Sequence, residues 1–193
     1  MDDIRELHRR AAEEFARRVE RIGPDDWSRP TPCTEWDVRA VVNHMAYENR
    51  WAPELVAGRT VEEVGTRFDG DLLGDDPKGA WRASMDEAIA AFAAPDALDR
   101  TVHLSFGDFP GREYLSQLTS DLAVHAWDVA KGIDGDDTLD PDVVAFVWGL
   151  WQGREELIRG SGVFGPPVEV ADGADLQTRL LAFLGRDRSW TRG

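Results

Sequence analysis

The chain has 193 residues, of which 37 are acidic and 22 basic, so its formal net charge is −15. This excess of negative charge excludes proteins that bind the nucleic-acid backbone or an anionic membrane surface, because both need clustered Lys and Arg. Hydrophobic residues make up 42% of the chain, enough for a buried core, and the single cysteine, Cys33, excludes an intrachain disulfide and a cysteine-rich metal site.

The N-terminal half predicts three helices. Apolar residues at helical spacing indicate an amphipathic helix over residues 3–22, which the Gly-Pro pair at 23–24 ends. A second helix is expected from Thr34 to about residue 57, with Thr34 and Asp37 resembling a capping box. Residues 58–77 are rich in Gly and Asp and are expected to form a long exposed connection. A third helix follows, and Pro95 lies beyond its end.

The C-terminal half predicts further helices and little strand. Residues 100–106 alternate in polarity and indicate a short strand, and residues 107–111 (GDFPG) are expected to form a turn. Helices are predicted over 112–132 and from Pro141 to about residue 158. In the tail, VEV (168–170) is a candidate short strand, and a helix is expected at about 174–184. The chain is therefore predicted to be an all-α helical bundle.

Histidines and carboxylates on two of these helices are the candidate functional residues. His125 lies on the apolar face of the 112–132 helix, with Asp121 one turn before it and Asp128 about one turn after it, on the edge of that face. His44 and Glu48 form a similar pair on the second helix. Two bundle helices that each offer a histidine and a carboxylate are typical of a metal site in a bundle core.

The other polar or reactive residues have simpler interpretations. His8 borders the apolar face of the first helix among arginines and is expected to be a surface or boundary residue, and His103 alternates with apolar neighbours and is expected to face solvent. Cys33 precedes a helix without an adjacent His or Lys, which favours a packed loop thiol over a nucleophile. Trp51 is expected in the core or on the wall of a pocket. A bundle whose buried histidines are only hydrogen-bonded, without a metal, remains the simplest alternative.

Three segments together carry a family resemblance: TPCTEWDVRAVVNHM (31–45), DLAVHAWDVAKG (121–132) and LQTRLLAFLGRD (176–187). The chain resembles actinobacterial proteins related to the metal-binding domain of mycothiol-dependent maleylpyruvate isomerase, within the DinB-like superfamily. The resemblance implies a DinB-like four-helix bundle with an additional helix and a short C-terminal strand and helix extension. It also implies one domain over 1–193, with the bundle core at about 3–160 and the extension at 161–193.

The same resemblance implies one divalent metal ion, usually zinc, held by His44, Asp121 and His125. The isomerase relatives carry Glu where this chain has Asp121, which leaves Glu48 as the alternative carboxylate, and Asp128 is expected to orient a histidine ring. The isomerase has a further C-terminal domain that contributes substrate-binding residues. Isomerisation of maleylpyruvate therefore does not follow from the resemblance.

Two neutral histidines and one carboxylate leave an open position on a tetrahedral ion. The leading hypothesis is a metal-dependent transferase or isomerase that activates a low-molecular-weight thiol, mycothiol by resemblance, for reaction with a small electrophile. One alternative is a non-catalytic metal-binding module closed by Glu48, and another is a metal-dependent hydrolase with Glu48 or Asp128 as the general base. A cytoplasmic location is expected because MDDIRELHRR lacks a signal-peptide pattern, and a homodimer is expected from the resemblance.

Overall fold

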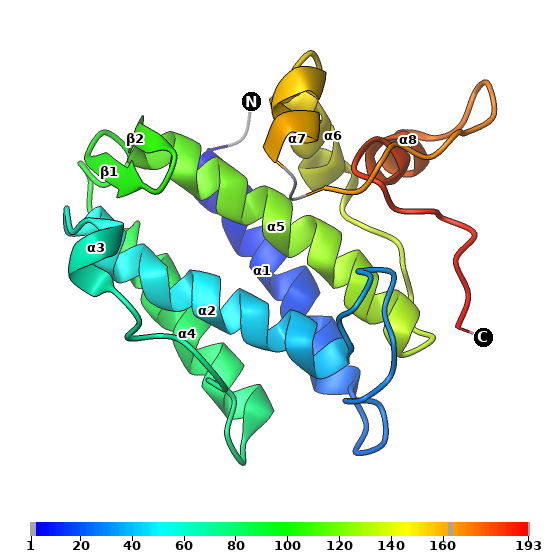
Figure 1. Ribbon diagram of the computed structural model, residues 1–193, viewed down its shortest axis with the longest axis horizontal. Helices are drawn as coiled ribbons and strands as arrows, with labels where there is room; N and C mark the ends of the chain where they lie inside the picture. Colours follow the sequence, from blue (N-terminus) through cyan, green and yellow to red (C-terminus); the bar gives the residue numbers. More distant parts are fainter. Residues whose placement is uncertain (1–2, 162–163, 193) are drawn as a thin grey trace.

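The computed structural model describes residues 3–161 and 164–192, and its longest helices lie side by side as a bundle (Figure 1). Helix α1 packs on α5, and α2 packs on both α4 and α5. This arrangement confirms the predicted all-α fold. The bundle helices are α1 (Ile4–Arg21), α2 (Val38–Val56), α4 (Pro77–Ala91) and α5 (Gly111–Gly132).

The core forms where the apolar faces of these helices meet. Leu7, Phe15 and Val19 recur at helical spacing along α1 and are buried. The ring of Phe15 stacks on Trp81 of α4 with 5.0 Å between centroids. Each such side chain contributes roughly 1.5–3 kcal/mol when it is fully buried. Helix α5 is buried along most of its length, including the fully buried Trp127, because it lies at the centre of the fold.

The segment after α5 forms a second set of helices on the outside of the bundle. Helix α6 (Pro141–Trp151) packs on α5, and α8 (Leu176–Phe183) packs on α6. The expectation of one continuous helix to residue 158 was wrong, because Gly153 takes a positive φ of 82° and α7 (Glu155–Ser161) begins as a separate helix. The expected strand at 168–170 was also wrong. Those residues pair with no strand, and the Val168 N–H donates instead to the Ala182 carbonyl of α8 at 2.9 Å.

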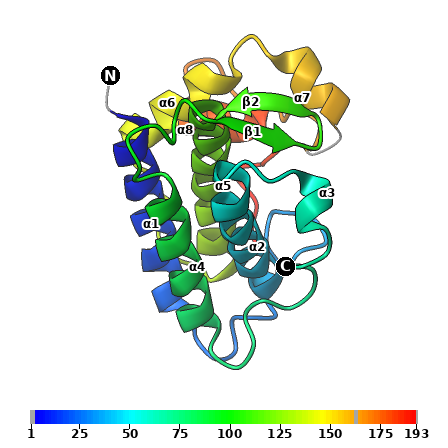
Figure 2. The ribbon, with the colours of Figure 1, turned by 90° about the vertical axis from the view of Figure 1, so that its left-hand side faces the viewer.

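Two connections carry more structure than the sequence predicts. Strand β1 (Thr101–Leu104) pairs antiparallel with β2 (Gly107–Pro110), so the residues expected as a turn form the second strand of a hairpin. The hairpin lies across one end of the bundle (Figure 2). The connection expected to be exposed over 58–77 contains the short helix α3 (Val61–Val64) and the buried side chains of Val64 and Leu73.

Helices α2 and α5 run antiparallel, and their relative position sets the site described below. Helix α2 begins at Val38 rather than near Thr34, because the Asp37 carboxylate caps the helix by accepting from the Ala40 N–H at 2.8 Å. Gly132 ends α5 close to this start, since a Cβ added there would lie 2.8 Å from the Val38 side chain. Within the described residues, the helices are too short or too polar to cross a bilayer.

Candidate metal centre

His44, Asp121 and His125 converge where α2 and α5 face each other. His44 comes from α2, and the other two residues lie one turn apart on α5. His44 Nε2 lies 3.2 Å from Asp121 Oδ2, and His125 Nε2 lies 3.8 Å from Asp121 Oδ1. The antiparallel packing of two helices thus brings together residues that are 77 positions apart in the chain.

The three donor atoms lie within 4.8 Å of one another. Zinc bonds to His nitrogen and carboxylate oxygen of about 2.0–2.2 Å imply tetrahedral donor separations of roughly 3.3–3.6 Å. The two separations that involve Asp121, 3.2 and 3.8 Å, are close to that range, so a rotation of the side chains would allow all three to reach one ion. The donor set, two imidazoles and one carboxylate, is also the type that borderline divalent cations prefer.

Asp128 determines which ring nitrogen of His125 faces His44 and Asp121. The His125 Nδ1 lies 3.0 Å from Asp128 Oδ2, and because a carboxylate only accepts, Nδ1 carries the proton. In the tautomer that this contact favours, the lone pair is on Nε2, the atom that points towards Asp121. The sequence suggested a place for Asp128 on the edge of the apolar face, but its side chain is fully buried.

Arg186, from the segment after α8, completes this buried chain of contacts. It donates from Nη2 and Nε to Asp128 at 3.1 and 3.4 Å, and it is only 8% exposed. Residue-by-residue reasoning missed this side chain. The only signal for it was its position in the C-terminal segment LQTRLLAFLGRD, where a charged residue follows a run of apolar ones.

The indole of Trp36 forms an aromatic wall beside the two histidines. Its ring centroid lies 4.8 Å from that of His44 and 5.8 Å from that of His125, and the two imidazoles lie edge to face at 5.1 Å. This contact restricts the rotation of both rings and covers one side of the site. The side chain of Asp121 remains 33% exposed, so solvent reaches the site from the Asp121 side.

The charges of the site stabilise an ionised Asp121. Burial raises the pKa of this carboxyl, but the hydrogen bond from His44 and the nearby His125, His44 and Arg186 outweigh it, so the net pKa is lowered. Burial likewise lowers the pKa of His44, whereas the hydrogen bond to Asp121 and the charges of Asp121 and Glu48 raise it above the ordinary value. The site therefore keeps a negative carboxylate at neutral pH.

Glu48 lies near the site without joining the group of close donors. Burial and the negative charge of Asp121 raise the pKa of Glu48 to about 7, against the opposing effect of His44. The mutually close donors are those of His44, Asp121 and His125, and Glu48 is not among them. Of the two carboxylates left open by the sequence, the geometry thus brings Asp121, rather than Glu48, to both histidines.

Cys33 forms a second group of close donors with His125 and Asp128. This group suits a cation poorly, because Asp128 already pairs with the guanidinium of Arg186. Burial and the charge of Asp128 raise the pKa of the Cys33 thiol to about 11, so it stays protonated at neutral pH.

The remaining two histidines lie away from the site. His103 is half-buried in β1, and its Nδ1 lies 2.7 Å from Asp108 of β2. His8 was expected to be a surface or boundary residue, but it is only 2% exposed, because the face of α1 that packs on α5 extends further round the helix than its apolar residues indicate.

Comparison with known proteins places these features in a family. The family model described as the mycothiol maleylpyruvate isomerase N-terminal domain matches residues 8–130, which include all three converging side chains. Two relatives from strains of Mycobacterium tuberculosis, the uncharacterized proteins MT0763 and Rv0738, are each 31% identical over 140 residues, which is 70% of this chain and 70% of theirs.

Solved structures show the same fold. The crystal structure of the mycothiol-dependent maleylpyruvate isomerase superposes with a TM-score of 0.62, and that of a mutant of it with 0.63. Both match at 15% identity and cover 79% of this chain and 68% of the other.

Proposed function

Because the chain belongs to the family of the mycothiol maleylpyruvate isomerase N-terminal domain, we propose that it is a metal-dependent enzyme acting with a low-molecular-weight thiol. The thiol is mycothiol, and the reaction is its transfer to a small electrophile or the isomerisation of that electrophile. The metal is a divalent cation, with zinc as the ion that two imidazoles and one carboxylate suit best. Its ligands are His44, Asp121 and His125.

The contact between His125 Nδ1 and the buried Asp128 carboxylate is the observation that carries this proposal. The ring is buried, its Nδ1 proton is held by Asp128, and its free Nε2 points towards the other two donors. Histidine ligands of metals commonly show this arrangement, in which a carboxylate on the far nitrogen fixes the tautomer and raises the basicity of the ring. A histidine with only a packing role would not require a buried carboxylate and a buried guanidinium behind it.

The bound metal would supply one open coordination position, at which a thiol is stabilised as its thiolate at neutral pH. The residues of the chain have complementary tasks. His44 and Asp121 would hold the ion from the two facing helices, Asp128 orients His125 through its Nδ1, and Trp36 covers one side of the site. The exposed part of Asp121 marks the side from which thiol and electrophile enter. Because Cys33 has a raised pKa, the reactive thiol comes from the cosubstrate.

The position of Glu48 favours a catalytic site over a purely structural one. A structural zinc site is closed by four protein ligands, and Glu48 does not reach the donor group. A metal-dependent hydrolase is the second candidate, because Glu48 lies close enough to Asp121 and His44 for their charges to act on its pKa, which places it to serve as the general base. We also propose that the protein forms a homodimer and is located in the cytoplasm.

Metal content tests the ligand assignment. Purified wild-type protein, loaded with zinc and dialysed, is expected to hold about one ion per chain by elemental analysis. His44→Ala, Asp121→Ala and His125→Ala are each expected to lose it, whereas His103→Ala, which replaces a histidine outside the site, is expected to keep it. Unchanged zinc content in the three site variants would show that the ligands were assigned wrongly.

Activity tests the reaction class. The zinc-loaded protein is incubated with mycothiol and monochlorobimane, in which the thiol displaces chloride, and separately with maleylpyruvate. Either conjugation or isomerisation is expected to require both zinc and mycothiol and to be lost in His125→Ala but not in His103→Ala. Full activity of the zinc-free protein, or turnover of simple esters without any thiol, would refute the proposal, and the second result would favour the hydrolase.

A further inference from the structure

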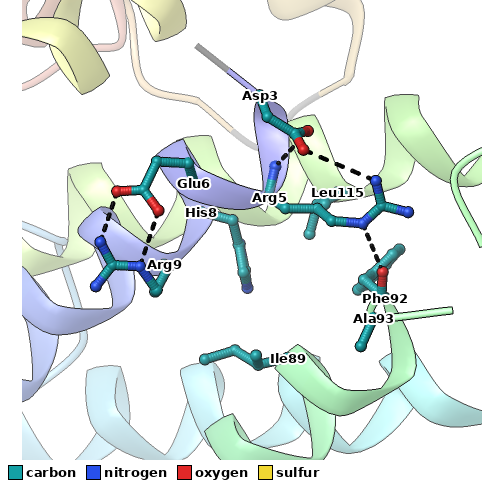
Figure 3. A pocket seen from close by; sticks show the side chains of 9 residues that line it. All are labelled: Asp3, Arg5, Glu6, His8, Arg9, Ile89, Phe92, Ala93 and Leu115. Atoms are coloured by element: carbon teal, nitrogen blue, oxygen red, sulfur yellow. Dashed lines mark hydrogen bonds and ion pairs between the residues drawn. The ribbon is translucent and has the colours of Figure 1, made fainter. Parts of the chain in front are cut away.

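A cavity of about 270 Å³ lies between α1 and α4, away from the metal centre (Figure 3). Its inner wall is formed by Ile89, Phe92 and Leu115, together with the ring of His8. His8 contacts Thr119 of α5, which is about 200° around that helix from Asp121. The cavity and the candidate metal ligands Asp121 and His125 therefore lie on different sides of α5.

The His8 side chain brings an unpaired acceptor to this wall. Its Nδ1 lies 3.3 Å from Thr119 Oγ1, and the Thr119 hydroxyl donates its single proton to the Leu115 carbonyl at 2.7 Å. The hydroxyl must therefore accept from His8, which places the ring proton on Nδ1 and leaves the lone pair on Nε2.

That Nε2 is buried and has no hydrogen-bond partner among the described residues. Buried polar atoms are nearly always hydrogen-bonded, so this acceptor calls for an explanation. Figure 3 shows the ring extending from α1 into the space above Ile89 of α4.

The charged residues at the mouth of the cavity are already paired. Arg9 donates to Glu6, and Arg5 lies against Asp3 and donates to the backbone carbonyls of Phe92 and Ala94 at 2.8 and 3.0 Å. Among the described residues that line the cavity, each charged side chain therefore already has a partner. A ligand is therefore selected by apolar contact and by one hydrogen bond, which favours a neutral molecule over an acid or an amine.

We propose that this cavity binds a small neutral molecule with a single apolar ring and one hydroxyl or N–H group, which donates to His8 Nε2. Phenols are the simplest members of this class. A cavity of roughly 150 Å³ is enough for benzene, so the observed volume accommodates one substituted ring. Burial lowers the pKa of His8 to about 4, so the ring is neutral and Nε2 remains an acceptor at neutral pH. Because Nε2 is covered by its neighbours, the His8 ring turns slightly as the ligand enters.

Binding of phenol and toluene to the wild-type protein tests the proposal directly. The two probes have similar shapes, but only phenol can donate to Nε2. Titrations followed by amide NMR are expected to shift resonances of residues around the cavity, with phenol binding about tenfold more tightly than toluene. Protein treated with a chelator is expected to behave identically, because the metal ligands lie on another face of α5.

Two variants and a control locate the site. His8→Leu is expected to weaken the binding of phenol about tenfold and to leave the affinity for toluene unchanged. Ile89→Trp, which fills the cavity, is expected to abolish the binding of both probes. The control His103→Leu is expected to change neither affinity. Equal affinities for phenol and toluene in the wild-type protein, or shifts confined to residues around His44, would overturn the proposal without any variant. Phenol affinity that survives His8→Leu would do the same.

Discussion

Replacing Asp128 by Asn is expected to affect both the stability of the fold and the binding of metal, through different partners. The carboxylate is fully buried and touches His125 Nδ1 at 3.0 Å and Arg186 at 3.1 and 3.4 Å. Asn keeps the shape and one carbonyl acceptor for His125, but it leaves the nearly buried guanidinium of Arg186 without a counter-charge. Breaking a buried ion pair from one side costs about 3–5 kcal/mol, and we expect the metal-free Asp128→Asn protein to lose that much unfolding free energy.

Replacing Arg186 by Met in the same protein separates the two roles. The double variant has no unpaired buried charge, so it is expected to regain at least about 2 kcal/mol relative to Asp128→Asn, which is a coupling typical of residues in direct contact. Zinc affinity is expected to remain about 10–100-fold below wild type in both variants, because Asn holds the His125 ring less firmly than a carboxylate does.

Urea unfolding in the presence of a chelator measures the stability change, and competition with a zinc indicator measures affinity. Two results would refute the reasoning about the ion pair: a loss of unfolding free energy below about 1 kcal/mol in Asp128→Asn, or a double variant no more stable than Asp128→Asn. Removing only the carboxylate should leave the buried charge of Arg186 unpaired at its full cost. Wild-type zinc affinity in Asp128→Asn would refute the orienting role.

Three further predictions concern pH and packing. The folded-state pKa of His8, about 4, lies below its unfolded value of 6.5, so its share of stability is complete above pH 6.5 and is lost as the pH falls towards 4. By linkage the wild-type protein loses about 2 kcal/mol of unfolding free energy through His8 between neutral pH and pH 5. In urea unfolding, His8→Leu is expected not to show this part of the pH dependence. The raised pKa of His44 means that protons compete with the metal, so zinc affinity is expected to fall on acidification from pH 7.5 to 5.5, as a competition titration would show. Gly132→Ala would place a Cβ 2.8 Å from the Val38 side chain and is expected to cost about 1–3 kcal/mol in thermal or urea unfolding, whereas Gly149→Ala, where nothing lies within 4 Å, is expected to cost nothing.

The sequence determined the helices of the bundle and the faces of the candidate ligands. The apolar spacing in α1 and α5 predicted both helices to within one or two residues, because that periodicity reflects burial along a regular helix. The same periodicity placed His125 and Asp121 on one face of α5 and His44 on a matching face of α2. The choice of these three as one ligand set came from the family resemblance.

Sequence reasoning was wrong where local patterns compete with tertiary contacts. His8 has the arginine neighbours of a surface residue, yet it is buried because α1 lies against α5 over a wider face than its apolar residues indicate. The hairpin strand Gly107–Pro110 has the composition of a turn, and it becomes a strand because β1 supplies the pairing edge.

What only the tertiary structure decided is the environment of each candidate ligand. The contact between Asp128 and Arg186 joins residues 58 positions apart, and it depends on how the segment after α8 packs against α5. That contact, together with the hydrogen bond from His125, determines which ring nitrogen is free. Helical periodicity is a property of neighbouring residues, and the sequence therefore contains it directly. Tautomer, pKa and cavity shape depend on atoms brought together from distant parts of the chain, so they are defined only once the helices have packed.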